Sequence, residues 1–268
     1  MLKDITLGQY FPGNSIAHKL DPRTKILLVT LYIIALFSAK GWMGYAVMAV
    51  TLAACVKVSH VGLRALVRGL KPLVFIIAFT GILNMFFTPD THYLWEWGIL
   101  RVSVKGIENA LFMVIRIMLL VMGTFLMTYT TSPIRLTDGL ESLLNPLKKI
   151  HVPVHELAMM MAIALRFIPT LIEETDKIMS AQKARGADFD SGNIFQKAKA
   201  LVPILVPLFI SAFRRADELA TAMECRCYHG GEGRTKLHVL KYQRRDYVAL
   251  AGGVVILALV VVLRSLGT

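Results

Sequence analysis

Two arginines in this sequence have neighbours that suggest a specific binding task. Arg185 stands between Ala184 and Gly186, and Arg226 stands between Cys225 and Cys227. Small neighbours let a long arginine side chain leave the end of a helix, and a guanidinium can form two parallel hydrogen bonds with a carboxylate. Two such motifs fit two similar grooves in other proteins. The alternative is that each arginine only interacts with the dipole of its own helix, and spacing alone favours that alternative.

Long segments with helical periodicity lead into both motifs. Apolar residues recur at helical spacing over 154–186, and glycine stands at the end of that segment. The segment 194–227 repeats the design, and Pro203 and Pro207 are expected to bend it. A shorter amphipathic helix is predicted before them at about 133–148, beginning at a Ser-Pro pair. The last two helices are expected to be long and to cross.

The composition indicates a membrane protein. The chain has 268 residues, is 55% hydrophobic and carries a formal net charge of +12. Soluble domains are usually about 45–50% apolar, and lipid leaves only helices or closed barrels as spanning structures. The alternating ten-residue segments of a barrel are absent, so we expect an all-α polytopic fold. Lysine and arginine gather in the cytoplasmic loops of membrane proteins, which explains the charge better than nucleic acid does.

Five transmembrane helices and three amphipathic cytoplasmic helices are therefore predicted. The membrane domain comprises residues 1–131, the cytoplasmic coupling domain 132–245, and the fifth transmembrane helix lies in 246–268. The segment 201–213 is too short for a sixth span, because it reaches about 20 Å against a hydrocarbon core of about 30 Å. The expected spans are 26–39, 42–56, 72–88, about 106–131 and 247–263.

Positive charge predicts the orientation. Most lysines and arginines fall in 1–25, 57–71 and 135–245, so these segments and the N-terminus are expected inside and the C-terminus outside. Aromatic residues at 93, 95 and 97 are typical of the opposite interface. Arg116 lies inside an apolar segment. It either faces neighbouring helices or contacts a partner, and the sequence does not decide between these.

The sequence as a whole resembles the transmembrane T component of energy-coupling factor transporters. The matching motifs cover essentially the whole chain and are specific in combination. They are Leu-Asp-Pro-Arg-Thr-Lys at 20–25, Leu-Arg-Phe-Ile-Pro at 165–169, Glu-Glu at 173–174, Ala-Gln-Lys-Ala-Arg-Gly-Ala-Asp-Phe at 181–189, Pro-Leu-Phe-Ile-Ser-Ala-Phe-Arg-Arg-Ala at 207–216, Ala-Met-Glu at 222–224 and Gly-Gly-Glu-Gly-Arg-Thr-Lys at 230–236.

That resemblance implies a non-catalytic subunit of a bacterial cell-membrane importer. Its partners would be two ABC-type ATPases, which bind ATP and Mg²⁺, and an S component that binds a vitamin or a metal ion; the chain itself would hold no cofactor. Carried over by position, Arg185 and Arg226 would dock the ATPases. The second motif departs from the family, in which small residues and often glycine stand around this arginine, because here Cys225 and Cys227 flank it. We therefore expect a weaker helix ending there and a turn at Gly230-Gly231 instead.

Two rival functions have less support. An ATPase would need the Walker A pattern, and no lysine follows the last glycine of 230–236 in the required way. The seven histidines show no zinc-binding spacing, and Cys-x-Cys lacks further ligands, so no metal site is predicted. A stand-alone secondary transporter or channel would place charges and broken helices at the membrane midplane, often in internal repeats. Arg116 alone is thin support for that alternative.

Overall fold

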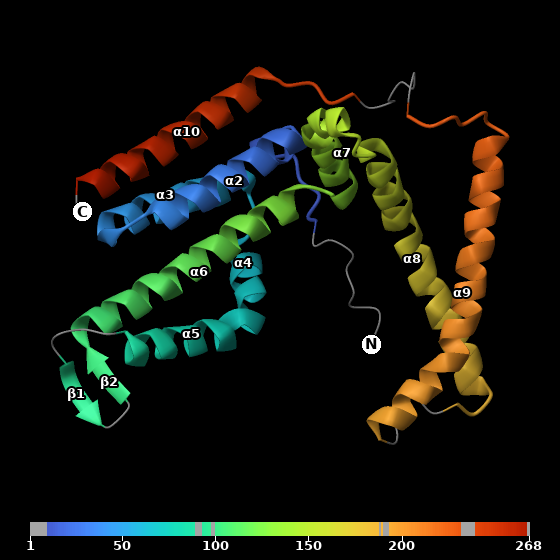
Figure 1. Ribbon diagram of the computed structural model, residues 1–268, viewed down its shortest axis with the longest axis horizontal. Helices are drawn as coiled ribbons and strands as arrows, with labels where there is room; N and C mark the ends of the chain where they lie inside the picture. Colours follow the sequence, from blue (N-terminus) through green and yellow to red (C-terminus); the bar gives the residue numbers. More distant parts are fainter. Residues whose placement is uncertain are drawn as a thin grey trace. The chain divides into compact units, whose positions relative to one another are not determined.

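The computed structural model describes residues 10–88, 93–97, 100–187, 189, 193–231 and 239–266. Within these ranges the chain is mainly helical (Figure 1), which confirms the predicted all-α membrane fold. A short antiparallel hairpin of β1 (Tyr93–Trp97) and β2 (Leu100–Ser103) is an addition that the sequence did not predict. The chain divides into two compact units. The bundle unit contains the described residues up to Ser142 and from Leu240 onward, and the arm unit runs from Leu143 to Val239.

The bundle unit is built from helices that begin and end at recognisable signals. Proline at the first position and the Asp21 side chain, which accepts from the Arg23 N–H, start the second helix. Ser103 caps the sixth helix by accepting from the Gly106 N–H. The bounds are α1 (Ile16–Lys19), α2 (Pro22–Ser38), α3 (Gly41–Ser59), α4 (Leu63–Leu70), a 3₁₀ turn η2 (Lys71–Leu73), α5 (Val74–Phe87), α6 (Val104–Thr130), α7 (Pro133–Leu144) and α10 (Arg244–Ser265).

The core of the bundle unit lies between α2, α3, α6 and α10. Leu36, Met48 and Val260 are fully buried there. Glycines allow close helix contacts: a Cβ at Gly253 of α10 would meet the Leu28 side chain of α2 at 2.7 Å. Since lipid supplies little hydrophobic drive between helices, small residues and tight packing stabilise such bundles.

Five helical segments in the described ranges are long and apolar enough to cross a membrane: Gly41–Ser59, Leu63–Phe87, Val104–Thr130, Val154–Ala184 and Arg244–Ser265. The number agrees with the prediction, but the set differs by one. The predicted span in α2 is not among them, since that helix has only 17 residues. Val154–Ala184 qualifies instead because its first half is apolar, whereas its second half carries Glu173, Glu174, Asp176 and Lys177.

The arm unit consists of two 31-residue helices, α8 (Val154–Ala184) and α9 (Ile194–Glu224). The 3₁₀ turn η3 (Asn145–Ile150) leads into α8, and His151 adopts a left-handed φ of 62° after it. Pro169 lies inside α8, and Pro203 and Pro207 lie inside α9. Figure 1 shows α9 bending along its length and crossing α8, as the sequence predicted.

Arg116 lies against neighbouring helices of the bundle unit. Its Nε donates to the Tyr45 hydroxyl at 2.9 Å, and its guanidinium lies 5.7 Å from the ring centroids of Phe37 and Tyr45. Contact of this kind between a cation and aromatic rings is favourable, and it agrees with the first of the two readings of Arg116. The aromatic side chains at 93, 95 and 97 fall outside what the structure describes.

Candidate functional site: two arginine-capped helix ends

The end of α8 is a tight turn with Arg185 as its capping residue. Gly186 has a φ of +86°, and its N–H donates to the Lys183 carbonyl at 3.0 Å. The N–H of Ala187 reaches back to the Gln182 carbonyl, also at 3.0 Å. These two bonds define a Schellman motif, in which glycine commonly takes the left-handed position. The motif satisfies carbonyls that the end of a helix would otherwise leave unpaired.

The end of α9 repeats the same turn around Arg226. Cys227 has a φ of +54°, and its N–H donates to the Glu224 carbonyl at 2.9 Å. The N–H of Tyr228 donates to the Met223 carbonyl at 3.1 Å. The bonding pattern matches that of α8 residue by residue. Arg226 is therefore the capping residue of a second Schellman motif.

The two predicted motifs are structurally equivalent. Arg185 and Arg226 each stand directly before the left-handed residue, and both are exposed. Ala184 and Cys225, which precede them, are exposed as well. Each helix thus presents a guanidinium at its negative dipole end with only small side chains before and after it.

The expectation that the second motif turns at Gly230-Gly231 instead of directly after Arg226 was wrong. Cys227 itself takes the left-handed conformation that glycine takes in the first motif, although this costs a residue with a Cβ about 1 kcal/mol. Gly230 adopts a positive φ of +94° three residues later, so the chain turns there as well. The helix ends before the left-handed Cys227, and the two Schellman hydrogen bonds satisfy the carbonyls of Met223 and Glu224.

A polar contact fixes the crossing of α8 and α9. The Arg215 guanidinium donates to Oε2 of Glu174 at 2.8 Å, and the Ser211 hydroxyl donates to the other oxygen of that carboxylate. The side chains of Glu174 and Arg215 are 23% and 30% exposed, so water screens the pair only in part. Because both carboxylate oxygens accept a hydrogen bond, the contact fixes the geometry of the helix crossing and also stabilises it.

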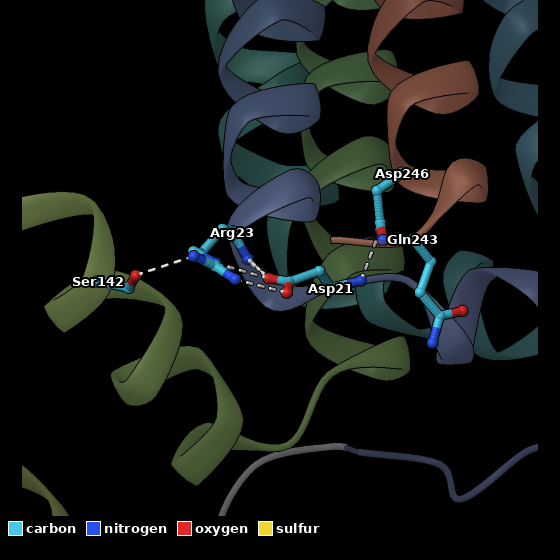
Figure 2. A network of polar contacts seen from close by, with 5 residues as sticks. All are labelled: Asp21, Arg23, Ser142, Gln243 and Asp246. Atoms are coloured by element: carbon cyan, nitrogen blue, oxygen red, sulfur yellow. Dashed lines mark hydrogen bonds and ion pairs between the residues drawn. The ribbon is translucent and has the colours of Figure 1, made fainter. Parts of the chain in front are cut away.

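The bundle unit contains a second polar cluster, at the starts of α2 and α10 (Figure 2), which the sequence analysis did not predict. The Asp246 side chain is buried, with the residue 1% exposed. It accepts from the backbone N–H of Asp21 at 2.8 Å and from that of Gln243 at 2.7 Å. The bond to Gln243 completes a capping box for α10. Asp246 therefore joins the starts of two helices that lie far apart in sequence.

Arg23 extends this cluster to α7. Its Nε and Nη2 donate to the Asp21 carboxylate, each at 3.1 Å, and its Nη1 donates to the Ser142 hydroxyl at 3.2 Å, as Figure 2 shows. The guanidinium also lies 4.1 Å from the centroid of the Tyr242 ring. The hydrogen bond from Arg23 to Asp21 raises the pKa of the guanidinium, which stays charged.

Two further contacts hold the end of α6 and the middle of α7 against α2. The Lys25 ammonium donates to the Thr130 carbonyl at 2.9 Å and to the Thr131 hydroxyl at 3.0 Å. A Cβ at Gly139 would approach the Pro22 Cβ to 2.8 Å, so the two helices meet almost backbone to backbone. These contacts therefore fix the position of α7 relative to α2 within the bundle unit.

No group of three or more His, Cys, Asp or Glu side chains suited to a metal ion occurs in the described part of the chain. The cysteines at 55, 225 and 227 are free and exposed. Each of the two exposed guanidiniums, at Arg185 and Arg226, has the geometry to donate two parallel hydrogen bonds to a carboxylate.

Comparison with known proteins gives a consistent result. A family model described as "CbiQ: Cobalt transport protein" matches residues 13–237. The chain is 52% identical over 263 residues to the energy-coupling factor transporter transmembrane protein EcfT of Ruminiclostridium cellulolyticum, with 98% of each chain covered. It is 55% identical over 268 residues to the protein of the same name from Acidaminococcus fermentans, covering 99% of this chain and 98% of that one. For the Bacillus subtilis protein the identity is 46% over 265 residues, with coverage of 99% and 100%.

Proposed function

This chain belongs to the CbiQ family, within it to the transmembrane components of bacterial energy-coupling factor transporters, and we propose that it couples two ABC-type ATPases to a substrate-binding S component. In this proposal the chain binds no nucleotide and catalyses no reaction. ATP and Mg²⁺ are held by the partner ATPases, and the S component captures the vitamin or metal ion. The N-terminus and the arm unit lie in the cytoplasm, and the C-terminus lies outside.

The two equivalent helix ends carry this proposal. Two ATPase subunits, whether they are different or identical chains, present two similar surfaces. Two arginines in the same local geometry suit such a pair. Each exposed guanidinium, at Arg185 and Arg226, would enter a groove and bond a carboxylate bidentately. The small residues around each arginine would let the groove close over the helix end. The left-handed turn would then direct the chain away from the ATPase surface.

The crossing of α8 and α9 would make the arm unit a stiff connection between the two docking points. The Glu174 carboxylate holds Arg215 and Ser211 of the other helix, well away from both arginine ends. When ATP binding closes the ATPases, the two docking points approach each other. A crossing that resists sliding converts this approach into movement of the remaining parts of α8 and α9.

The exposed apolar face of α9 is the surface we assign to the S component. These residues recur at helical spacing, which places them on one side of the helix, and each is about half exposed or more: Leu201, Val202, Leu205, Val206, Phe209, Ile210 and Phe213. A contiguous apolar face of this kind marks a protein or membrane interaction site. An S component is itself a membrane protein, so it offers a matching apolar surface.

Charge reversal at the two helix ends tests the proposal. Arg185→Glu and Arg226→Glu, expressed with the neighbouring transporter subunits, should each reduce copurification of the ATPases by about thirtyfold or more, because losing one partner of a buried charge pair costs at least about 2 kcal/mol. Substrate uptake should fall with it. Lys177→Glu and Arg214→Glu are matched controls, since both are exposed cations within the same two helices, and they should retain the ATPases.

A double reversal at Arg185 and Arg226 that keeps wild-type uptake would refute the docking role. Solute transport by the purified chain alone in liposomes would favour the alternative, a stand-alone secondary transporter or channel. Insertion into the membrane should be unaffected in every variant, because all four reversed residues are exposed.

A further inference from the structure

The short helix α4 has a geometry that the coupling function does not require. It lies between α3 and α5, and Figure 1 shows it turned across the direction of α5 and α6. Only residues 60–62 separate it from α3, and η2 leads directly into α5. Leu63–Phe87 as a whole is long and apolar enough to cross a membrane, but η2 and the change of direction separate α4 from α5. Charged side chains are costly in the hydrocarbon core, so α4, which carries Arg64 and Arg68 within eight residues, is placed at the membrane interface.

One face of α4 is anchored to the bundle unit. Leu66 is fully buried, and Leu70 is 7% exposed. A Cβ at Gly69 would approach the Phe125 ring of α6 to 2.6 Å, so this glycine packs directly on α6. The orientation of α4 is thus fixed by its own packing, and the opposite face is held outward.

That outward face combines an apolar edge with a basic edge. Leu63 and Val67, one turn apart, are 65% and 57% exposed. Arg64, Arg68 and Lys71 are exposed as well. At 100° per residue the five side chains occupy one continuous arc of about 140°, with the aliphatic pair on one side and the three cations on the other.

The chain on either side of the basic edge contains no acidic residue over a long stretch. No aspartate or glutamate occurs between Asp21 and Asp90, which covers α2, α3, α4 and α5. Neither α4 nor its chain neighbours α3 and α5 carries a carboxylate, and Glu108 of α6 lies about 25 Å along that helix from Phe125, where α4 packs. An external anion would therefore complement the three exposed cations. The adjacent exposed aliphatic residues need an apolar environment.

We propose that the outward face of α4 is a binding site for anionic phospholipid headgroups. Arg64, Arg68 and Lys71 contact the phosphates, while Leu63 and Val67 insert at the level of the upper acyl chains. An in-plane helix with this division of side chains is typical of interfacial membrane helices. Free phosphate would satisfy the cations but not the aliphatic edge, so a lipid is the occupant. The inference does not depend on the docking arginines.

Fluorescence quenching in lipid nanodiscs tests this site. The complete transporter, carrying Val67→Cys with a bimane label and no other reactive cysteine, is reconstituted with bromine-labelled phosphatidylglycerol or bromine-labelled phosphatidylcholine. The anionic lipid should bind at the label with at least about fivefold preference, because a basic residue near an anionic surface contributes about that factor. High salt should reduce the preference, since exposed charges are screened within about 3 Å at 1 M.

The triple variant Arg64→Gln, Arg68→Gln, Lys71→Gln should lose the preference while remaining quenched by both lipids. The control Lys148→Gln, Lys149→Gln, Lys241→Gln removes three exposed cations elsewhere and should keep it. Equal quenching of the label by the two lipids in the protein that retains Arg64, Arg68 and Lys71 would overturn the proposal, whether or not the triple variant folds. A label that neither lipid quenches would also overturn it. So would clearly stronger quenching when the chain is reconstituted without the ATPase subunits, because the subunits would then cover this face and make it a protein site.

Discussion

Exchanging the residues at the two left-handed positions separates backbone geometry from side-chain chemistry at the docking ends. Gly186 has a φ of +86°, and a Cβ built there meets no atom within 4 Å. Gly186→Ala therefore introduces only the conformational cost of a left-handed alanine, about 1 kcal/mol. Cys227 already has this cost at a φ of +54°. Cys227→Gly removes it, and the greater freedom of glycine in the unfolded chain offsets about the same amount.

The expected effects are therefore unequal. Gly186→Ala should weaken ATPase binding about fivefold, because about 1.4 kcal/mol corresponds to a factor of ten in affinity. Cys227→Gly should change it by less than about twofold. Cys227→Ala keeps the left-handed cost and removes the thiol, so it should bind as the wild type does. The assay is the equilibrium affinity of the purified ATPases for the detergent-solubilised chain, immobilised for interferometry.

Hydrogen–deuterium exchange of the last turn of α8 supplies a measurement without the ATPases. Gly186→Ala should increase exchange at the Ala187 amide, whose bond to Gln182 depends on the left-handed turn. Wild-type affinity in Gly186→Ala, or a fivefold loss in Cys227→Gly, would refute the geometric account of the motifs. A loss in Cys227→Ala would show that the thiol itself is needed.

Substitutions at three further sites test contacts inside each of the two units. Glu174→Ala and Arg215→Ala, combined in a double-mutant cycle, should show a coupling energy of about 1 kcal/mol in thermal stability, because the pair is only partly exposed; additive effects would contradict the role of this contact. Asp246→Ala should destabilise the chain by about 2–4 kcal/mol, since two buried N–H groups lose their acceptor, whereas Asp246→Asn should cost less. Gly139→Ala should lower the free energy of unfolding by about 1–3 kcal/mol through overpacking against Pro22. A thermal unfolding midpoint equal to that of the wild type would show that α2 and α7 separate readily.

Local signals in the sequence predicted most of the helices. The apolar stripe over 154–186, ended by Gly186, predicted α8 almost to the residue, because periodicity and a C-terminal glycine are both local properties. The helix predicted at about 133–148 begins as expected at Pro133, but as an α-helix it ends at Leu144, where η3 takes over at the Asn145-Pro146 pair. The resemblance to the T component of energy-coupling factor transporters is confirmed by the family match.

Contacts between distant segments could not be predicted in this way. The bond from Asp21 to Asp246 joins residues 225 apart, and neither residue stands in a pattern that indicates the other. The turn at Cys227 was not predicted because residues with a Cβ rarely adopt positive φ, so the expected position moved to the next glycines. The five candidate spans are also not the five that the sequence predicted. The apolar helix α2 has only 17 residues and is not among them, whereas α8 is included because its first half is apolar.

Photocrosslinking from the two arginine positions tests the central claim most directly. A photoreactive amino acid replaces either Arg185 or Arg226 in the complete transporter, and a third version carries it at Lys177, an exposed position within α8. Both helix ends should crosslink to nucleotide-binding subunits with high yield, and Lys177 should not. Crosslinks from either helix end to lipid alone, or to no nucleotide-binding subunit, would contradict the account.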